Sequence, residues 1–368
     1  MQRSQKALLS VCMWVGFVVL ARWQLPVQSS AARQAATPSV LTMTLRARSV
    51  QEHLGLDRDQ ISRLRAELMK VETPLWRLRD LPEAEQLEKA GPLLRELNEA
   101  TSRILLPHQR DRLHELILQA QGIRAVAMPS VAGRLRLTTA QRAGIGDILR
   151  DLDRQLAEPG GRNPAALDAA SGDELRAEAE RQIFDLLGAG QRRVLNRMMG
   201  PPFDFATIRH IACKAPDVRG IEAWINSEPL TLGQLEGKVV ALHFYTFGCI
   251  NCIRNLPHYN AWYEAFPNDR FVVLGIHTPE TEGEHDIARV RRKAEEAEMQ
   301  YPLAVDNKEE TWKAWANHVW PAVYLIDKEG FVRYWWYGEL NWQQIEGEKW
   351  MRRRIRELLA EDVRRRRP

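Results

Sequence analysis

The sequence predicts an all-α region with an internal duplication, followed by an α/β domain at the C-terminal end. Two observations lead to this order. From about residue 41 to 199 apolar residues recur at helical spacing, and from residue 215 onward β-rich runs alternate with helical stretches. The chain has 368 residues, of which 45% are hydrophobic, so it is long enough to form a core in each region.

The N-terminal residues 1–35 have the pattern of an export signal. Arg3 and Lys6 precede an apolar run over residues 7–21, and small residues follow at 29–32. The run is shorter than the roughly 20 residues that span a membrane, but it could extend to Val27. We therefore expect a signal peptide or a signal anchor, and a protein that acts in the bacterial periplasm or at the outer face of the cytoplasmic membrane.

The helical region, predicted over residues 41–200, contains one short element four times. A Leu-x-x-x-Gln pattern occurs at residues 56–60, 105–109, 137–141 and 187–191. The first two elements are 49 residues apart and the last two are 50 apart, which predicts two repeat units, about 41–125 and 126–200. The residues after each leucine suit the beginning of an amphipathic helix.

Two of these elements, LGLDRDQISRL and LRLTTAQRAGI, resemble the LTxxQ elements of small helical bacterial envelope proteins of the Spy and CpxP kind. In those proteins the element marks a helix-loop-helix junction. We favour a structural or partner-binding role for the region, which includes homo-oligomer formation, over chaperone activity.

Four strands and four helices are predicted in the α/β domain, residues 215–361. The strands are expected at 239–245, 271–277, 322–327 and 331–338, and the helices at 250–266, 285–299, 309–317 and 346–361. This alternation predicts a central sheet covered by helices, with parallel strands first and a hairpin at the end. The basic tail at 362–368 is interpreted as solvated, and a net charge of +4 with interspersed signs predicts no nucleic-acid partner.

The candidate site is a Cys-x-x-Cys pair, Cys249 and Cys252, among only four cysteines. A predicted strand precedes it and a helix follows, so Cys249 lies at a helix N-terminus, where the helix dipole lowers a thiol pKa. Cys249 is the expected nucleophile, and Cys252 resolves the mixed disulfide. A zinc site and an ordinary disulfide are the alternatives for this pair, but zinc needs about four ligands, and the domain has no second Cys-x-x-Cys or close histidine pair. We therefore predict no metal and no cofactor beyond the redox-active disulfide.

The CINC motif, GIHTPE at 275–280, YPLAVDN at 301–307 and the Trp320-Pro321 step resemble the thioredoxin-like superfamily. The nearest resemblance is to the C-terminal domain of DipZ-type envelope proteins, with the TlpA and ResA kind as neighbours. It implies a thioredoxin-like fold, thiol-disulfide oxidoreductase activity on protein thiols or disulfides, and a cis Pro321 that faces the cysteines. Trp320, Ile250 and Asn251 are the candidate substrate-binding residues. The electron donor or acceptor stays open.

The chain departs from these families at two places. TlpA and ResA proteins carry a glutamate where this chain has Asn255, which weakens the transfer of a role in cytochrome c maturation. Thioredoxins keep a buried acid where this chain has His243. His243 could exchange a proton with Cys252 near neutral pH, or it could be a hydrogen-bonded core residue. His277 and Glu280 are further candidates for the rim of the site.

Two other functions stay open. Thr246-x-x-Cys249 matches half of the peroxiredoxin signature, although Leu242 occupies its proline position. The chain could also be a helical envelope interaction protein that uses the thioredoxin-like domain for docking. The intact cysteine pair favours an enzyme over a docking module.

Overall fold

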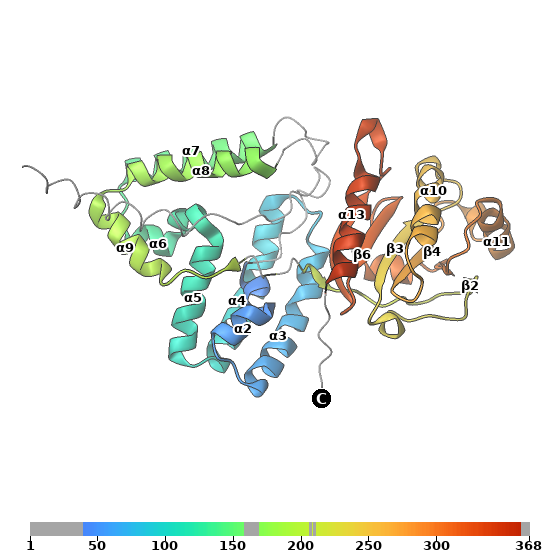
Figure 1. The fold of residues 1–368 in the computed structure, drawn as a ribbon, viewed down its shortest axis with the longest axis horizontal. Helices are drawn as coiled ribbons and strands as arrows, with labels where there is room; N and C mark the ends of the chain where they lie inside the picture. The colour runs from blue at the N-terminus through green and yellow to red at the C-terminus, as the bar shows by residue number, and fades with distance from the viewer. Residues whose placement is uncertain (1–39, 158–168, 206–207, 209–210, 362–368) are drawn as a thin grey trace, which may run out of the picture.

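The computed structural model describes residues 40–157, 169–205, 208 and 211–361. A helical region and an α/β domain lie side by side along the long axis of the molecule (Figure 1). The predicted export signal and the predicted basic tail lie outside the described residues. None of the helices in the described part is long and apolar enough to cross a membrane.

The helical region contains no strand over the described part of residues 40–200, as predicted. Its helices are α1 (Val40–Arg46), α2 (Arg48–His53), α3 (Arg58–Arg77), α4 (Glu83–Ile104), α5 (Pro107–Gln121), η1 (Gly122–Ala127), α6 (Pro129–Arg134), α7 (Thr139–Ala157), α8 (Ala169–Leu186) and α9 (Ala189–Met199). Two short helices, a helical hairpin and a final helix occur twice in this order. The two halves of the region therefore have the same arrangement of elements.

The glutamines of the four Leu-x-x-x-Gln elements pair within each half. Gln60 Nε2 donates to Gln109 Oε1 at 2.8 Å, and in the second half Gln141 Nε2 donates to Gln191 Oε1 at 2.9 Å. Each glutamine oxygen also accepts the backbone N–H of the residue three positions earlier, which caps its own helix. The elements are helix N-termini, as expected. In each half, the hydrogen bond between the two glutamines also connects the N-termini of two helices.

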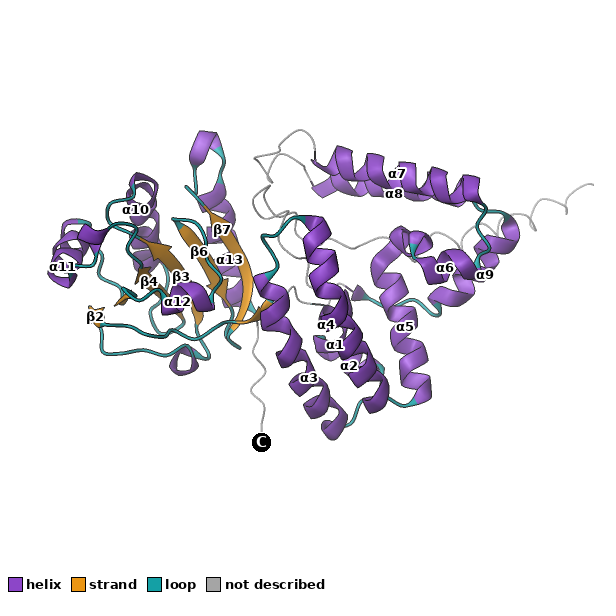
Figure 2. Cartoon of the chain, turned by 180° about the vertical axis from the view of Figure 1, so that it is seen from behind, coloured by secondary structure: helices purple, strands orange, loops and turns teal. Residues whose placement is uncertain are grey.

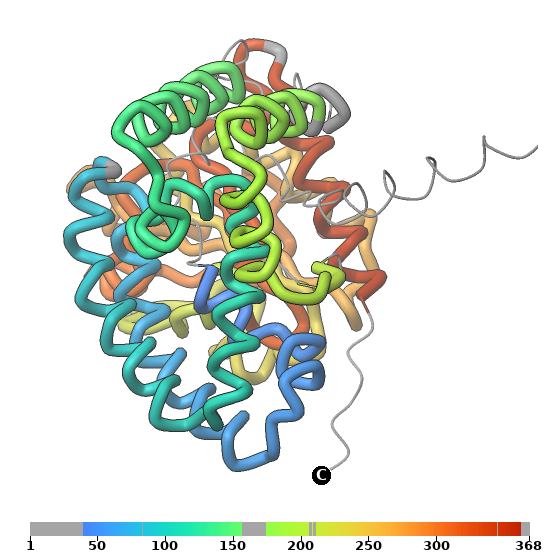
Figure 3. Tube along the Cα trace, turned by 90° about the vertical axis from the view of Figure 1, so that its left-hand side faces the viewer, coloured from blue at the N-terminus to red at the C-terminus, as the bar shows by residue number. Residues whose placement is uncertain are grey.

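The hairpin of each half has a different environment. The end of α3 lies against the α/β domain, and α3 also contacts its first strand, β1 (Cys213–Lys214). The paired helices α7 and α8 lie side by side along the top of the helical region as seen in Figure 3. The hairpin of the first half thus contacts the sheet of the α/β domain through α3.

The α/β domain is built on a seven-stranded sheet in the order β1-β7-β6-β3-β4-β5-β2 (Figure 2). The strands are β1 (Cys213–Lys214), β2 (Ala223–Ile225), β3 (Val239–Tyr245), β4 (Phe271–His277), β5 (Leu303–Val305), β6 (Ala322–Ile326) and β7 (Phe331–Tyr337). The helices are η3 (Gly233–Leu235), α10 (Ile250–Ala265), η4 (Glu282–Glu284), α11 (Ile287–Glu296), α12 (Glu310–Ala314), η5 (Trp342–Gln344) and α13 (Gly347–Ala360). Strands β3, β4 and β5 are parallel, and β6 and β7 form the antiparallel hairpin that was predicted.

Three strands and two helix ends differ from the prediction. Strands β1, β2 and β5 have only two or three residues each, too few for an alternation of apolar and polar residues to show in the sequence. Helix α12 ends at Ala314 because Ala316 has a φ of +47°, and α11 ends at Glu296 because Glu298 has a φ of +54°. Neither residue type signals a left-handed position.

The sheet is covered on both faces, and all seven residues of β3 are buried. Ala241 and Tyr245 face a core formed with α10, α11 and α13. Leu242 and Phe244 face a second core that includes Cys213 of β1 and Trp76 of α3. The helical region therefore completes the second face of the sheet.

Candidate active site

The two cysteines occupy the first turn of α10, directly after the central strand β3. Cys249 is the N-cap residue, with φ −81° and ψ 115°, and its backbone oxygen accepts the N–H of Ile253 at 3.0 Å. Cys249 is partly exposed, whereas Cys252 is only 1% exposed, and both are free thiols. A substrate can therefore reach the first sulfur but not the second.

The electrostatic environment separates the two thiols further. A hydrogen bond from the Cys252 thiol is the largest effect that lowers the pKa of Cys249 to about 6, and the backbone N–H groups of Asn251 and Cys252 add to it. Burial and the carboxylate of Glu280 oppose this shift. Burial is the first cause that raises the pKa of Cys252, and its hydrogen bond to Cys249 is the second. Such a pair holds a thiolate outside and a protonated thiol inside at neutral pH.

The Trp320–Pro321 step lies at the same edge of the sheet as the turn to Cys249, because Ala322 pairs with Phe244 near the end of β3. The peptide bond of this step is cis, as the resemblance implied, and Pro321 directly precedes β6. Trp320 is half-buried; it stacks on Trp312 with ring centroids 4.1 Å apart, and its indole N–H donates to the backbone oxygen of Thr278 at 3.1 Å. Trp320, Cys249 and Phe247 all pack against the core on the α10 face of the sheet.

The two residues between the cysteines face outward. Ile250 is 56% exposed and Asn251 is also exposed. Ile253, one turn along the same helix, is exposed as well. The thiolate position is therefore bordered by apolar surface that an incoming polypeptide could cover.

His243 lies in the core rather than at the surface of the site. It is completely buried; its ring stacks on Tyr259 at 4.1 Å, and Nε2 lies 3.1 Å from the hydroxyl of Tyr301. Nδ1 has no hydrogen-bond partner among the described residues. Burial lowers the pKa of His243 to about 3, so the ring is neutral at pH 7. The geometry fits the core-residue interpretation, because neither ring nitrogen bonds Cys252 in this part of the structure.

Glu284 was not identified from the sequence, although it fixes the turn before Cys249. It is 3% exposed, and its carboxylate accepts the backbone N–H groups of Gly248 at 2.9 Å, Glu280 at 2.7 Å and Thr281 at 2.9 Å. Burial opposes ionisation of Glu284, but the side chain of Thr246 and these backbone hydrogen bonds together outweigh it and lower the pKa of Glu284. Thr281 and Glu284 form a capping box, so the Thr-x-x-Glu spacing was the available signal.

The two candidates for the rim lie in different places. Glu280 is exposed, and its charge acts on both cysteines. The expectation was wrong for His277, which is completely buried and stacks on Phe247 with centroids 5.4 Å apart. His277 is the last residue of β4, and its ring contact with Phe247 links this strand to the turn before Cys249. No three His, Cys, Asp or Glu side chains form a metal-binding group in the described residues.

Removing the thiol of Cys252 tests the charge on Cys249. The substitution Cys252→Ala deletes the main hydrogen bond to the thiolate, so the pKa of Cys249 should rise from about 6 towards the ordinary thiol value of about 8.5. The pH dependence of iodoacetamide alkylation of the reduced chain measures this pKa. Cys252→Ser is the matched control, because its hydroxyl can still donate. Identical midpoints in the wild type and Cys252→Ala would contradict the assignment.

His243 should make the protein less stable in acid. An unfolded histidine has a pKa of about 6.5, whereas burial lowers the pKa of His243 to about 3, so the unfolded state binds more protons between these values. Stability therefore falls as the pH decreases through this window, by about 2 kcal/mol at pH 5. Urea denaturation at pH 7 and pH 5 should show a smaller loss for His243→Gln than for the wild type. An equal loss would mean that His243 is not buried as a neutral ring.

Comparison with known proteins supports the predicted resemblance. Residues 211–335 match the model of the AhpC/TSA family. Protein DipZ of Mycobacterium tuberculosis is 41% identical over 135 residues, which make up 36% of this chain but only 19% of DipZ. The crystal structure of a thioredoxin-like superfamily protein aligns with 40% of this chain and 97% of that chain, with 29% identity and a TM-score of 0.37.

The thiol-disulfide oxidoreductase YkuV of Bacillus subtilis is matched over almost its whole length. It is 30% identical over 147 residues, which make up 40% of this chain and 94% of YkuV. Through its C-terminal domain, the chain therefore belongs to the thioredoxin-like family of thiol-disulfide oxidoreductases.

Proposed function

We propose that this protein is an exported enzyme that exchanges disulfides with protein thiols through Cys249 and Cys252. The observation that carries the proposal is the pairing of a partly exposed thiol of low pKa with a buried, protonated thiol on one helical turn. Export is supported by the signal pattern of residues 1–35. The Cys-x-x-Cys pair is the redox centre in this proposal.

The exchange proceeds in two steps. The Cys249 thiolate attacks one sulfur of a substrate disulfide; that disulfide breaks, a mixed disulfide forms, and the leaving sulfur takes up a proton. Cys252 then loses its proton and attacks the sulfur of Cys249, which releases the second substrate thiol. Two electrons pass from the cysteine pair to the substrate, and the reverse sequence oxidises a substrate dithiol.

The surrounding side chains have separate roles in this reaction. The buried position of Cys252 keeps substrates away from the second sulfur until the mixed disulfide forms. Ile250, Asn251 and Trp320 offer the surface next to Cys249 on which a polypeptide can lie. Glu284 holds the turn at Gly248, so that the nucleophile stays at the helix N-terminus.

Reduction of insulin by dithiothreitol tests the proposal with a protein disulfide. Cys249→Ser should lower the catalysed rate at least about 100-fold, because the nucleophile is lost. Cys252→Ser should accumulate a mixed disulfide that denaturing gels without reductant detect. Cys213→Ser is the matched control, since this cysteine is completely buried in β1 and should leave the rate within about twofold. Full activity of Cys249→Ser would contradict the proposal.

A peroxidase is the second candidate, favoured by the match to the AhpC/TSA family and by Thr246-x-x-Cys249. A peroxidase that reacts at Cys249 would consume hydrogen peroxide without Cys252. Consumption of peroxide by Cys252→Ser at the wild-type rate, together with no reduction of insulin by the wild type, would favour this alternative.

A further inference from the structure

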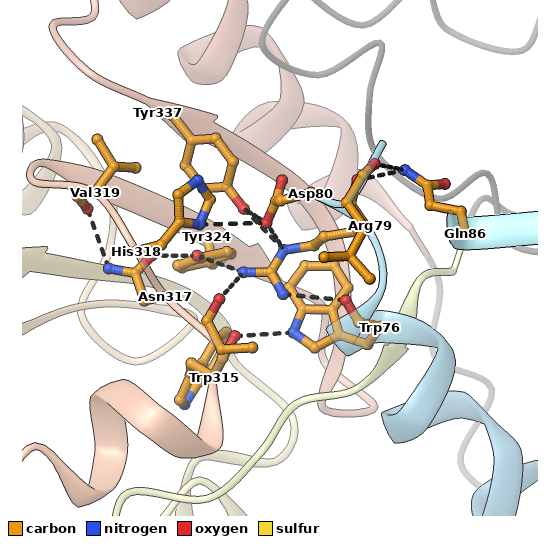
Figure 4. A network of polar contacts seen from close by, with 12 residues as sticks. Trp76, Arg79, Asp80, Gln86, Trp315, Asn317, His318, Val319, Tyr324 and Tyr337 are labelled. Carbon is orange, nitrogen blue, oxygen red and sulfur yellow. Dashed lines mark hydrogen bonds and ion pairs between the residues drawn. The ribbon is translucent and has the colours of Figure 1, made fainter. Parts of the chain in front are cut away.

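The loop of residues 315–320 leads from α12 to the cis proline, and the helical region holds it (Figure 4). Arg79 Nη2 donates to the backbone oxygen of Ala316 at 2.7 Å. The indole N–H of Trp76 donates to the backbone oxygen of Trp315 at 3.2 Å. Asp80 Oδ2 lies 3.4 Å from Nδ1 of His318. Trp76 of α3, together with Arg79 and Asp80 directly after this helix, thus contacts three residues of one loop in the other domain.

Arg79 is the centre of these contacts and is completely buried. Its guanidinium also donates to the hydroxyl of Tyr337 at 2.8 Å and to that of Tyr324 at 3.4 Å, and it pairs with Asp80 at 3.1 Å. It lies over the ring of Trp76, 4.1 Å from the centroid. A buried guanidinium is tolerated only when its donors are satisfied, and its planar fork permits few arrangements. Arg79 therefore links the helical region to β6, β7 and the loop of the α/β domain.

The contacts continue along the loop to Trp320. The hydroxyl of Tyr324, which Arg79 contacts, donates to Asn317 Oδ1 at 2.6 Å, and Asn317 Nδ2 donates to the backbone oxygen of Val319 at 3.1 Å. Ala316 has a φ of +47°, a conformation that a non-glycine residue keeps only when its surroundings impose it. The backbone directly before Trp320 is thus held by Arg79 and by a tyrosine that Arg79 contacts.

We propose that Trp76, Arg79 and Asp80 form a clamp that positions the loop 315–320 for binding of the protein substrate. Arg79 is a positioning residue in this clamp, since it acts through the loop and Trp320 and touches neither sulfur. The helical region is then a part of the substrate-binding apparatus rather than a spacer. This inference rests on the proposed exchange of disulfides with proteins.

Arg79→Met tests the clamp in the full chain, because methionine keeps much of the apolar stem but donates no hydrogen bond. Insulin is the protein probe, and 5,5′-dithiobis(2-nitrobenzoate) is a small disulfide that does not need the loop. We expect the KM for insulin to rise about tenfold with kcat within about twofold, because binding is lost rather than chemistry. The rate with the small disulfide should stay within about twofold.

Arg46→Met is the matched control at the same interface. Arg46 of α1 pairs with Glu72 of α3 and lies over the ring of Phe331, 4.4 Å from its centroid, at the beginning of β7. It makes none of the contacts to the loop that define the clamp, so its KM for insulin should stay at the wild-type value. If Arg79→Met does not fold, Asp80→Asn serves in its place. The substitution Asp80→Asn keeps the size of the side chain but removes the negative charge beside His318.

The outcomes separate the clamp from the proposed function. An unchanged KM for insulin in Arg79→Met, an equal rise in Arg46→Met, or an equal loss with the small disulfide would each overturn the clamp. Full activity of Cys249→Ser would instead overturn the proposed disulfide exchange. A selective rise of the insulin KM in Arg79→Met alone supports both.

Discussion

The unequal burial of two sulfur atoms on one helical turn is the constraint on which the rest of the site depends. Strand β3 is buried on both faces, so its end is fixed, and a turn of three residues leads from it to Cys249. Glu284 accepts the N–H of Gly248 and holds that turn. Because positions three apart on a helix are neighbours, Cys252 turns inward beneath Cys249 and can share its proton with it.

The helical region has a structural connection to this site. Trp76 is part of the core beneath the second face of the sheet, a position that the α/β domain does not fill by itself. The buried Arg79 next to it joins α3 to β6, β7 and the loop before Pro321. In the proposed clamp, the contacts to this loop come from the hairpin of the first half.

The sequence predicted the parts of the structure that have local signals. The four longer strands were predicted because their apolar runs are long enough to be recognised as strands. The cysteine pair was identified as a redox site because a strand precedes it and a helix follows it. Strands β1, β2 and β5 were too short to show a pattern. The spacing of the four glutamines indicated helix N-termini, but their pairing depends on how the helices pack.

The missed residues of the site depend on tertiary contacts. Arg79 lies in a stretch rich in arginine and leucine, and nothing local separates this buried arginine from the exposed arginines nearby. Glu284 carried only a capping signal, and its link to Gly248 joins residues 36 positions apart. For His243 the sequence left two roles open, and only burial beside Tyr259 and Tyr301 separates them.

The most direct measurement is the redox equilibrium of Cys249 and Cys252 in the full chain, poised with glutathione mixtures. Alkylation of free thiols followed by peptide mass spectrometry reports this pair without interference from the other cysteines. We expect one reversible two-electron transition in which both cysteines change together and which Cys249→Ser abolishes. A cysteine pair that stays reduced in every glutathione mixture, or two cysteines that oxidise independently, would contradict the proposed disulfide exchange.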